Sequence, residues 1–284
     1  SSWRLLLSNP SPPITDALIS NIRNQSRCLV AFSGGVDSAV VAKAAMEALG
    51  PNHCLAVTAV SPSLAEREQQ IAVTVAKQIG IGHRLIETHE MDQSQYRAND
   101  GQRCFYCKSE LYQKLTEIAN KENFSAILNG TNSDDQTDYR PGLEAAEKFN
   151  VRSPLVDCGI DKKRVREVAK AWNLMVWDKP ASPCLASRVA YHEVVDPKKL
   201  KMIELAEDWL LENGFREIRV RFHAGALARV EVSLGDLGRF LDDHFRETFL
   251  SRLKKIGFRY VTIDLEGFRS GNLNTALPTY QINN

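Results

Sequence analysis

The sequence predicts an α/β protein in which a domain built on a parallel sheet precedes a smaller α+β domain. Short β-branched runs alternate with longer amphipathic runs from about residue 27 to residue 180. This alternation is typical of βαβ units, whose strands are parallel. After the proline-rich segment 178–184 the order changes to one helix followed by alternating strand patterns. A chain of 284 residues is long enough for both domains.

The α/β part is expected to contain four strands and five helices. The strands are predicted over residues 28–32, 53–60, 83–88 and 125–130. Helical periodicity predicts helices over 38–49, 63–80, 108–123, 141–150 and 162–173, the last two flanking the short run 151–156. Glycines at positions 50 and 80 stop the first two helices. In such a fold ligands bind at the carboxyl ends of the strands.

The second part begins with a helix over 196–215, with Pro197 near its start and Gly214 near its end. Strands are predicted over 217–223, 227–233 and 259–265, with a helical stretch over 234–257. The boundary is expected near residues 185–197. The resulting domains are 1–190 and 191–284, and the second is expected to bind substrate and to contribute to oligomer contacts.

Composition and charge indicate an ordinary globular protein, with 43% apolar and 25% charged residues and a formal net charge of +1. Every apolar run is shorter than the roughly 20 residues of a membrane span. The apolar part of the first residues is too short for a signal peptide, so a cytoplasmic location is expected. The small net charge argues against a nucleic-acid partner without excluding an RNA substrate.

The hexapeptide Ser33-Gly34-Gly35-Val36-Asp37-Ser38 connects the first strand to the first helix. A glycine-rich turn that opens a helix presents backbone N–H groups and favours phosphate. The GxGxxG pattern and the Gly-Lys-Ser/Thr ending of a Walker loop do not occur here. The carboxylate of Asp37 is explained if Mg²⁺ binds beside the phosphates. The alternative is a glycine turn with an acidic helix cap.

This hexapeptide resembles the PP-loop of the ATP pyrophosphatase families, which have a Rossmann-like sheet. Those enzymes cleave ATP between the α and β phosphates and transfer AMP to an acceptor oxygen. The resemblance implies that all six residues bind ATP and that Asp37 is catalytic and holds Mg²⁺. The adenosine of that fold lies at the end of the second strand. This implies roles for Ala59 and, in the next helix, Arg67.

The segment after the fourth strand carries further nucleotide candidates. Gly130, Thr131 and Asp134 could hold AMP, and Asp135 is a candidate second ligand for Mg²⁺. Asn132 lies among them. The alternative is a turn rich in Asn and Asp that caps a helix.

Three of the six cysteines are candidates for chemistry. Cys28 and Cys54 lie in apolar strand runs and are expected in the core, and Cys158 is expected to be structural. Cys104 and Cys107 form a CxxC motif, which alone could be redox-active, metal-binding or accidental. Together with Cys184 in a loop of prolines and small residues, they suit a [4Fe–4S] cluster with one free iron position. A reduced thiol pair and a buried loop cysteine are the alternative.

Longer segments are similar to the LarE-type family of ATP-dependent sulfur transferases over nearly the whole chain. They are GTNSDD with DYRPG, ASPCLASR and VRFH. The resemblance implies adenylation of a carboxylate of pyridinium-3,5-biscarboxylic acid mononucleotide and its conversion to a thiocarboxylate, in two rounds. The product belongs to the nickel-pincer nucleotide pathway that matures lactate racemase.

The family has two branches that differ in the source of sulfur. In one, the cysteine of PCLASR donates its own sulfur and becomes dehydroalanine. In the other, three cysteines hold a [4Fe–4S] cluster whose extra sulfide is transferred. The CxxC motif favours the cluster branch, with Cys104, Cys107 and Cys184 as ligands. Cys184 is required in either branch.

Cationic residues are expected to bind the phosphate and carboxylate of the substrate. Arg219 and Arg221 alternate along a predicted strand and therefore share one face. By resemblance they bind the substrate phosphate, and the alternative is a face of solvated arginines. Arg140 and Arg188 are further candidates, with Asp236 near them.

Two other functions remain open at this point. One is a PP-loop tRNA thiolase with a three-cysteine cluster, and the other is a non-catalytic AMP-binding sensor. The resemblance also implies a homo-oligomer, a hexamer in that family, and leaves the sulfide donor unidentified. The sulfur-transfer hypothesis requires the three thiols to converge within reach of the ATP-cleaving loop.

Overall fold

The computed structural model describes residues 13–137 and 141–269. The chain divides into two compact units. Of the described residues, the first comprises 13–60, 66–88, 108–137 and 141–182, and the second comprises 61–65, 89–107 and 183–269. This division differs from the single boundary expected near residue 190. Two early segments, one of which carries the CxxC motif, pack with the C-terminal part of the chain.

The first unit is built on a parallel sheet in the order β3-β2-β1-β4, which confirms the predicted α/β class. The strands are β1 (Cys28–Ala31), β2 (Cys54–Val60), β3 (Gly82–Glu87) and β4 (Ala126–Leu128). Because β1 pairs with β2 and β4 in parallel, the carboxyl ends of these three strands lie at one edge of the sheet. The residues that follow β1 and β4 are the PP-loop and the segment 129–135.

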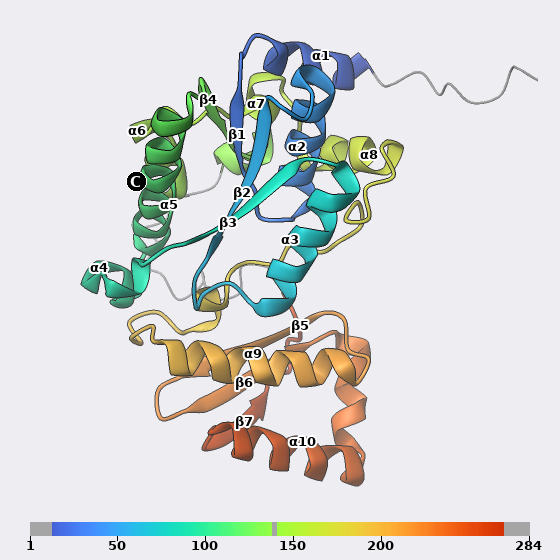
Figure 1. Ribbon diagram of the computed structural model, residues 1–284. Coiled ribbons are helices and arrows are strands. Elements are labelled where there is room, and N and C mark those ends of the chain that lie inside the picture. The colour runs from blue at the N-terminus through green and yellow to red at the C-terminus, as the bar shows by residue number, and fades with distance from the viewer. Residues whose placement is uncertain (1–12, 138–140, 270–284) are drawn as a thin grey trace, which may run out of the picture. The chain divides into compact units, whose positions relative to one another are not determined.

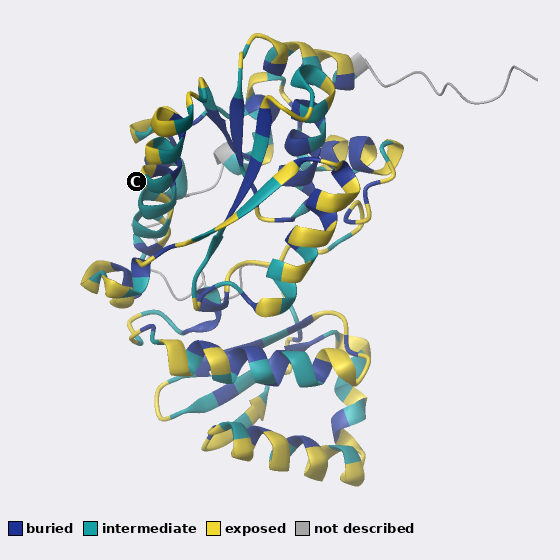
Figure 2. Ribbon diagram, viewed as in Figure 1, coloured by how far each residue is buried: buried dark blue, intermediate teal, exposed yellow. Residues whose placement is uncertain are grey.

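Helices cover both faces of this sheet (Figure 1). They are α1 (Pro13–Arg23), α2 (Val36–Leu49), α3 (Glu66–Ile79), α5 (Arg103–Glu122), α6 (Pro141–Lys148), α7 (Pro154–Asp157) and α8 (Lys162–Ala171). The helix α2 is apolar on most of its surface and lies in the core, with Val40, Val41 and Ala44 fully buried. Buried residues run along β1 and α2, while the outer face of α3 is exposed (Figure 2). Such two-sided burial explains why β1 and β2 read as nearly continuous apolar runs.

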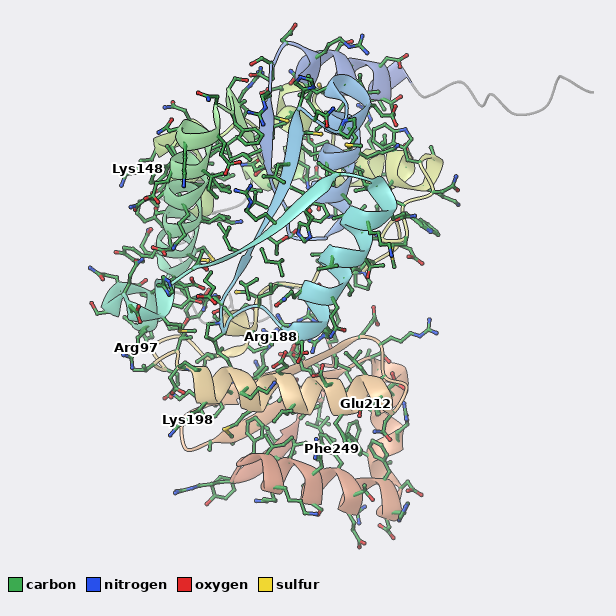
Figure 3. All side chains as sticks on the ribbon, viewed as in Figure 1. Arg97, Lys148, Arg188, Lys198, Glu212 and Phe249 are labelled. Carbon is green, nitrogen blue, oxygen red and sulfur yellow. The ribbon has the colours of Figure 1, made fainter. Side chains whose placement is uncertain are left out.

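The second unit has a three-stranded sheet in the order β5-β6-β7. The strands are β5 (Ile218–His223), β6 (Leu227–Val232) and β7 (Tyr260–Ile263); β5 and β6 are antiparallel, and β6 and β7 are parallel. Two helices accompany it, α9 (Pro197–Glu212) and α10 (Asp243–Ile256). Phe249 of α10 packs its ring 5.4 Å from that of Trp209 on α9 (Figure 3). This aromatic core explains why a unit with a small sheet can fold.

Several elements differ from the sequence prediction. The helix α1 was not predicted, and α5 begins at Arg103 rather than at residue 108, so the CxxC motif lies in its first turns. The helical stretch 234–257 is divided at Asp242, which caps α10 by accepting a hydrogen bond from the Phe245 N–H over 2.8 Å. Short elements complete the chain: η1 (Glu90–Asp92), α4 (Ser94–Arg97), η2 (Ser133–Thr137), η3 (Leu185–Arg188) and η4 (Leu234–Leu241). Among residues 13–137 and 141–269, no helix combines the length and hydropathy needed to cross a membrane.

Candidate active site

The PP-loop presents backbone N–H groups at the carboxyl edge of the first unit's sheet. Gly35 is the N-cap of α2 and has no side chain that could accept a capping hydrogen bond. The first N–H groups of the helix are therefore directed at the loop. The hydroxyl oxygens of Ser33 and Ser38 lie 3.1 Å apart, and Ser38 donates to the Gly35 carbonyl over 3.1 Å. These bonds hold the loop around the positive end of the helix dipole. That arrangement is suited to bind phosphate.

Two glycines of the site are required by close backbone contacts. Gly34 has φ +73°, and a Cβ there would lie 2.6 Å from the Cα of Ala72 on α3. A Cβ on Gly130 would lie 2.7 Å from the main-chain nitrogen of Ser38. The segment after β4 therefore packs directly on the first turn of α2. The structure brings the two predicted nucleotide segments together.

A polar network surrounds Asp37. Its Oδ1 accepts a hydrogen bond from Asn132 Nδ2 over 3.0 Å, and its Oδ2 is paired with Lys162 Nζ. The Lys162 main-chain N–H donates to Asp134 Oδ2 over 3.0 Å. The Asn132 main-chain N–H donates to Asp135 Oδ2 over 3.1 Å. The three carboxylates predicted to serve AMP or Mg²⁺ thus lie in one network, held by Asn132 and Lys162.

Lys162 was not among the predicted site residues. It is the first residue of α8, where Asp161 accepts a capping hydrogen bond from the Arg164 N–H over 2.8 Å. The sequence therefore indicated a helix start and nothing more. The neighbouring Lys163 is exposed, and no local pattern distinguishes the two lysines. The ion pair with Asp37 arises because the fold brings together residues 125 positions apart.

The remaining nucleotide candidates lie on β2 and α3. Ala59 is the penultimate residue of β2, at the same carboxyl edge as the PP-loop, and pairs with Ile86 of β3. Arg67 is the second residue of α3 and is half-buried. Thr131 donates its main-chain N–H to Asn129 Oδ1 over 3.1 Å. Contact of these residues with a nucleotide remains a prediction.

The three candidate cysteines belong to the second unit and gather around two buried side chains. Cys184 and Cys104 both act electrostatically on the guanidinium of Arg103, and Cys184 and Cys107 both act on the phenol of Tyr96. Burial raises the pKa of Tyr96, and the two thiols raise it further. Cys104 and Cys184 are exposed, and Cys107 is half-buried. These shared interactions place the three cysteines near the same two buried side chains, and their convergence on one metal group within reach of the ATP loop stays a prediction.

The donor atoms suit the predicted metal groups in kind. Three thiols are the ligands that an iron–sulfur cluster with one open position requires. The carboxylates of Asp37, Asp134 and Asp135 are oxygen donors of the type that Mg²⁺ prefers. Within residues 13–137 and 141–269, no group of three or more His, Cys, Asp or Glu side chains is arranged to hold a metal ion. Metal binding at either place stays a prediction.

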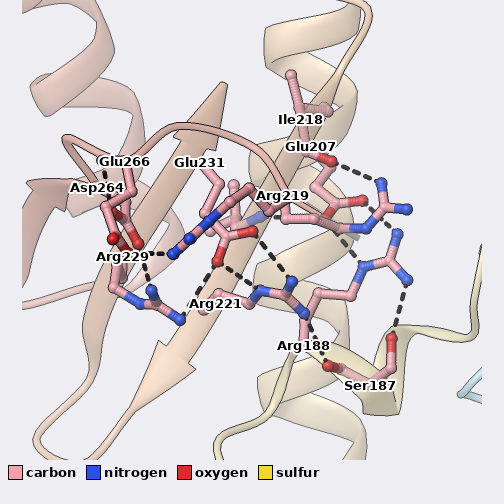
Figure 4. Close-up of polar contacts among 12 residues, drawn as sticks. Ser187, Arg188, Glu207, Ile218, Arg219, Arg221, Arg229, Glu231, Asp264 and Glu266 are labelled. Carbon is pink, nitrogen blue, oxygen red and sulfur yellow. Dashed lines mark hydrogen bonds and ion pairs between the residues drawn. The ribbon is translucent and has the colours of Figure 1, made fainter. Parts of the chain in front are cut away.

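An arginine cluster lies next to the cysteine loop in the same unit (Figure 4). Arg188 forms a bidentate pair with Glu207, with Nε–Oε1 at 3.0 Å and Nη2–Oε2 at 3.2 Å. Its Nη1 also donates to the Cys184 carbonyl over 3.0 Å. Arg221 pairs in the same way with Glu231, with both N–O distances at 3.0 Å, and donates to the Ser187 carbonyl over 3.0 Å. Both arginines are buried.

This burial argues against the alternative of solvated arginines for Arg221, one of the two strand residues to which that alternative applied. Arg188 and Arg221 instead connect the loop of Cys184 to α9, β5 and β6. The guanidinium groups of both arginines already form bidentate pairs with carboxylates. Sequence reasoning missed both partners, Glu207 and Glu231. A usable signal existed for Glu207, because it occupies a helical position four residues after Ile203 and three before Leu210, which are buried.

Arg219 differs from its two neighbours. Burial, together with the like charges of Arg188 and Arg221, lowers its pKa to about 10, although Glu207 and Glu231 oppose the shift. Its guanidinium also lies 4.9 Å from the centre of the Phe268 ring. The cluster contains four guanidinium groups, Arg229 included, and three carboxylates, those of Glu207, Glu231 and Asp264. Arg219 Nη1 donates to the Ile218 carbonyl over 2.6 Å.

Two further residues were predicted to bind or adjoin the substrate, Arg140 and Asp236. Arg140 lies outside the described residues. Asp236 of η4 accepts a hydrogen bond from the Ser233 hydroxyl over 2.8 Å and pairs with Arg239 at 3.5 Å. A role for either residue in substrate binding remains a prediction.

Comparison with known proteins places these observations in context. Residues 14–103 match the NAD synthase family, which agrees with the PP-loop reading of the α/β unit. Pyridinium-3,5-bisthiocarboxylic acid mononucleotide synthase of Lactiplantibacillus plantarum is 34% identical over 265 residues, covering 93% of this chain and 95% of that protein. A Synechocystis protein described as uncharacterised is 43% identical over 251 residues, covering 88% and 93%. Another, from Methanocaldococcus jannaschii, is 31% identical over 244 residues, covering 86% and 91%.

Proposed function

Because the chain belongs to the LarE-type family of ATP-dependent sulfur transferases, we propose that it converts the carboxylates of pyridinium-3,5-biscarboxylic acid mononucleotide to thiocarboxylates. The observation that carries this proposal is the relation to the Lactiplantibacillus plantarum synthase, which spans 93% of this chain. The product would enter the synthesis of the nickel-pincer nucleotide of lactate racemase. The proposal assigns one half-reaction to each of the two compact units.

The first half-reaction activates the carboxylate and is assigned to the first unit. A carboxylate oxygen of the substrate attacks the α phosphorus of ATP, and pyrophosphate leaves. The N–H groups of the PP-loop and the ammonium of Lys162 offset the negative charge on the phosphates. Mg²⁺ held by Asp37 and Asp135 would neutralise more of that charge when bound.

The second half-reaction replaces AMP with sulfur and is assigned to the second unit. A sulfur nucleophile attacks the acyl carbon, and AMP leaves with the bonding electrons, so the exchange is redox-neutral. A [4Fe–4S] cluster bound by Cys104, Cys107 and Cys184 would supply sulfide. The gathering of the three thiols around Arg103 and Tyr96 supports this source. The alternative is the sulfur of Cys184 itself, which would leave dehydroalanine at that position.

The arginine cluster is proposed to bind the substrate phosphate, with Arg219 as its main contact. Support comes from the position of Arg219 beside Arg188 and Arg221: burial and these two like charges lower its pKa more than Glu207 and Glu231 raise it. Arg188 and Arg221 would define the shape of this site, since ion pairs with Glu207 and Glu231 hold their guanidinium groups in place. A phosphate would relieve the repulsion among the three guanidinium groups.

Association of the chain with copies of itself is proposed to involve the second unit. Large apolar side chains are exposed there, at Leu234, Leu241, Tyr260 and Leu265. Exposed apolar surface of this kind is typical of interaction sites. Light scattering of the full chain at several concentrations tests this. A monomer at all concentrations would refute the association.

The function is tested by following both half-reactions on oxygen-free protein. Pyrophosphate release is measured with ATP and the pyridinium biscarboxylate, and the mass of the acceptor is measured in parallel. We expect Asp37→Asn to abolish both signals and Cys184→Ala to abolish only the gain of sulfur. Loss of both signals in Cys184→Ala would contradict the assignment of separate sites.

The same experiment separates the alternatives. Iron and sulfide analysis of the starting protein should give about four irons per chain. Colourless protein whose residue 184 becomes dehydroalanine during turnover would identify the sacrificial sulfur source. Thiolation of tRNA rather than of the nucleotide would identify a tRNA enzyme. Absence of pyrophosphate release with every acceptor would favour an AMP sensor.

A further inference from the structure

One buried arginine joins the two segments that carry the candidate cysteines. Arg103 is the first residue of α5, adjacent to Cys104, and is only 7% exposed. Its Nη1 donates to the Ala186 carbonyl over 2.9 Å, and Ala186 lies two residues after Cys184. The same nitrogen donates to the side-chain oxygen of Asn99. A single guanidinium therefore fixes the start of α5 to the loop of the third cysteine.

Asn99 makes a second connection to the same loop, a few residues after Ala186. It is fully buried, and its Nδ2 donates to the Val189 carbonyl over 3.2 Å and to the Ala190 carbonyl over 2.8 Å. Its backbone has φ +54°, a conformation that Asn adopts more readily than most residues. Arg103 and Asn99 thus hold residues 186–190 at three carbonyl groups. Side chains of this kind determine where the Cys184 loop lies.

Arg103 also carries a positive charge that is buried. Both of its acceptors, in Asn99 and Ala186, are neutral oxygens. Arg103 is adjacent in sequence to Cys104, and the Ala186 carbonyl to which it donates lies two residues after Cys184. A buried cation is costly unless an anion accompanies it. Thiolates of these cysteines that bind a metal group would be such anions.

We propose that Arg103 is the positioning residue of the three-cysteine site, which holds the Cys184 loop against α5 and supplies the buried positive charge opposite the thiolates. It does not touch substrate, because it is buried. The charge-supplying part rests on the proposed function, since it presumes thiolates that carry an iron–sulfur cluster. The positioning part holds for the cysteines with or without the cluster.

Positioning is tested on the full chain in metal-free, reduced form. A short bifunctional thiol reagent is added, and peptides that join Cys184 to Cys104 or Cys107 are quantified by mass spectrometry. We expect Arg103→Gln to reduce this cross-link about tenfold or more, because two hydrogen bonds from a charged donor are lost or weakened. Arg97→Gln is the matched control, since Arg97 is exposed on α4 and should leave the yield unchanged.

The charge is tested on protein reconstituted with iron and sulfide without oxygen. Removing a cation beside an anionic group makes it harder to reduce, so the reduction potential should shift to more negative values in Arg103→Gln. Arg103→Lys keeps the charge but not the planar fork. It should therefore keep the potential near the wild-type value while still losing cross-link yield. If Arg103→Gln does not fold, Arg103→Lys and Asn99→Ala carry the positioning test, and an unchanged yield in both would overturn the proposal.

The outcomes separate this proposal from the proposed function. Wild-type cross-linking that is unaffected by any Arg103 variant overturns the positioning role, even if the wild type binds a cluster. An unchanged potential in folded Arg103→Gln overturns the charge role. Failure of the wild type to bind iron refutes the cluster and the charge role together. The cross-link then still decides whether Arg103 positions the thiols.

Discussion

Arg188 and Glu207 form a bidentate ion pair that is closed off from solvent, with each side chain 1% exposed. Glu207 also accepts a hydrogen bond from the main-chain N–H of Val220 over 3.1 Å. The pair therefore joins the loop after Cys184, the helix α9 and the strand β5 within the second unit. The net contribution of such a buried ion pair to stability is small. Removing only one of its two partners is far more costly, because the remaining charge stays buried without a partner.

Removal of Glu207 should destabilise the protein strongly. We expect Glu207→Ala to lower the free energy of unfolding by about 3–5 kcal/mol, because the Arg188 charge would remain buried and unpaired. Urea unfolding followed by circular dichroism measures the change. Glu212→Ala on the same helix is the control, since Glu212 is exposed and its loss should cost less than about 0.5 kcal/mol. Equal effects of the two substitutions would contradict the assigned role of the pair.

Gly34 should tolerate no side chain. Alanine there would adopt φ near +73° and collide with the backbone of Ala72. The positive φ costs about 1–2 kcal/mol, and the collision adds about 1–3 kcal/mol. Gly50→Ala separates these effects, because Gly50 has φ +79° and its Cβ would meet no described atom within 4 Å. Gly34→Ala should be less stable than Gly50→Ala and should alone lose pyrophosphate release.

Lys162 should contribute to ATP binding. Its ammonium pairs with Asp37, and we expect it to contact the phosphates when ATP and Mg²⁺ are bound. Lys162→Met should weaken ATP binding about tenfold, the effect of about 1.4 kcal/mol. Isothermal titration calorimetry measures the change, and Lys163→Met, at an exposed position, is the control. Unaltered affinity in Lys162→Met would restrict the lysine to a structural role.

The six cysteines should react with iodoacetamide at very different rates. Burial raises the pKa of Cys28 to about 12 and that of Cys54 to about 11, so both thiols stay protonated and shielded. Cys104 and Cys184 are exposed. In native metal-free protein near pH 8, these two should be alkylated first and the strand cysteines last. Peptide mass spectrometry at timed intervals reports the order, and unfolding in urea should abolish it. Early labelling of Cys28 would argue against the parallel sheet core.

The stability of the second unit should fall in mild acid through His223. Burial lowers its pKa from 6.5, and the charges of Arg229 and Arg221 lower it further. The unfolded chain then takes up the proton at a higher pH than the folded chain, so stability decreases as the pH falls below about 6.5. In addition, Arg229 Nε donates to His223 Nε2 over 3.1 Å, which requires that nitrogen to be unprotonated.

Unfolding free energies measured between about pH 7 and pH 5 test this effect. His223→Gln should make the dependence on pH shallower. His244→Gln, at an exposed position of α10, should show the same dependence of unfolding free energy on pH as the wild type. His83 contributes to the slope in both variants, because burial lowers its pKa as well. Identical slopes in the two variants would show that His223 is not the titrating group.

Local patterns were sufficient to predict the parallel sheet and the PP-loop. Apolar strand runs such as 28–31 need burial on both faces, and only a parallel sheet between helix layers supplies it. Gly34 and Gly35 at a strand-to-helix junction have one common use, a close approach to phosphate. The helix start at Asp196 and Pro197 was also predicted, because a cap and a fixed φ act over a few residues.

The start of α5 was predicted five residues too late, because the segment 103–107 lacks the apolar periodicity that marks a helix. Likewise, the order of the segments along the chain could not predict that the CxxC motif packs in the same unit as the C-terminal part. It depends on contacts of Arg103 and Asn99 with carbonyls more than 80 residues away. Backbone carbonyls carry no sequence signal, so such partners stay hidden until the chain is folded.

By itself, the sequence determined that this protein has a PP-loop and a CxxC motif, because those features depend on residue identity at short spacing. The tertiary structure alone decided which charges accompany them: Lys162 beside Asp37, and Arg103 between the cysteine segments. The physical reason is that burial makes the energy of a charge depend on its neighbours in space, and those neighbours come from distant parts of the chain.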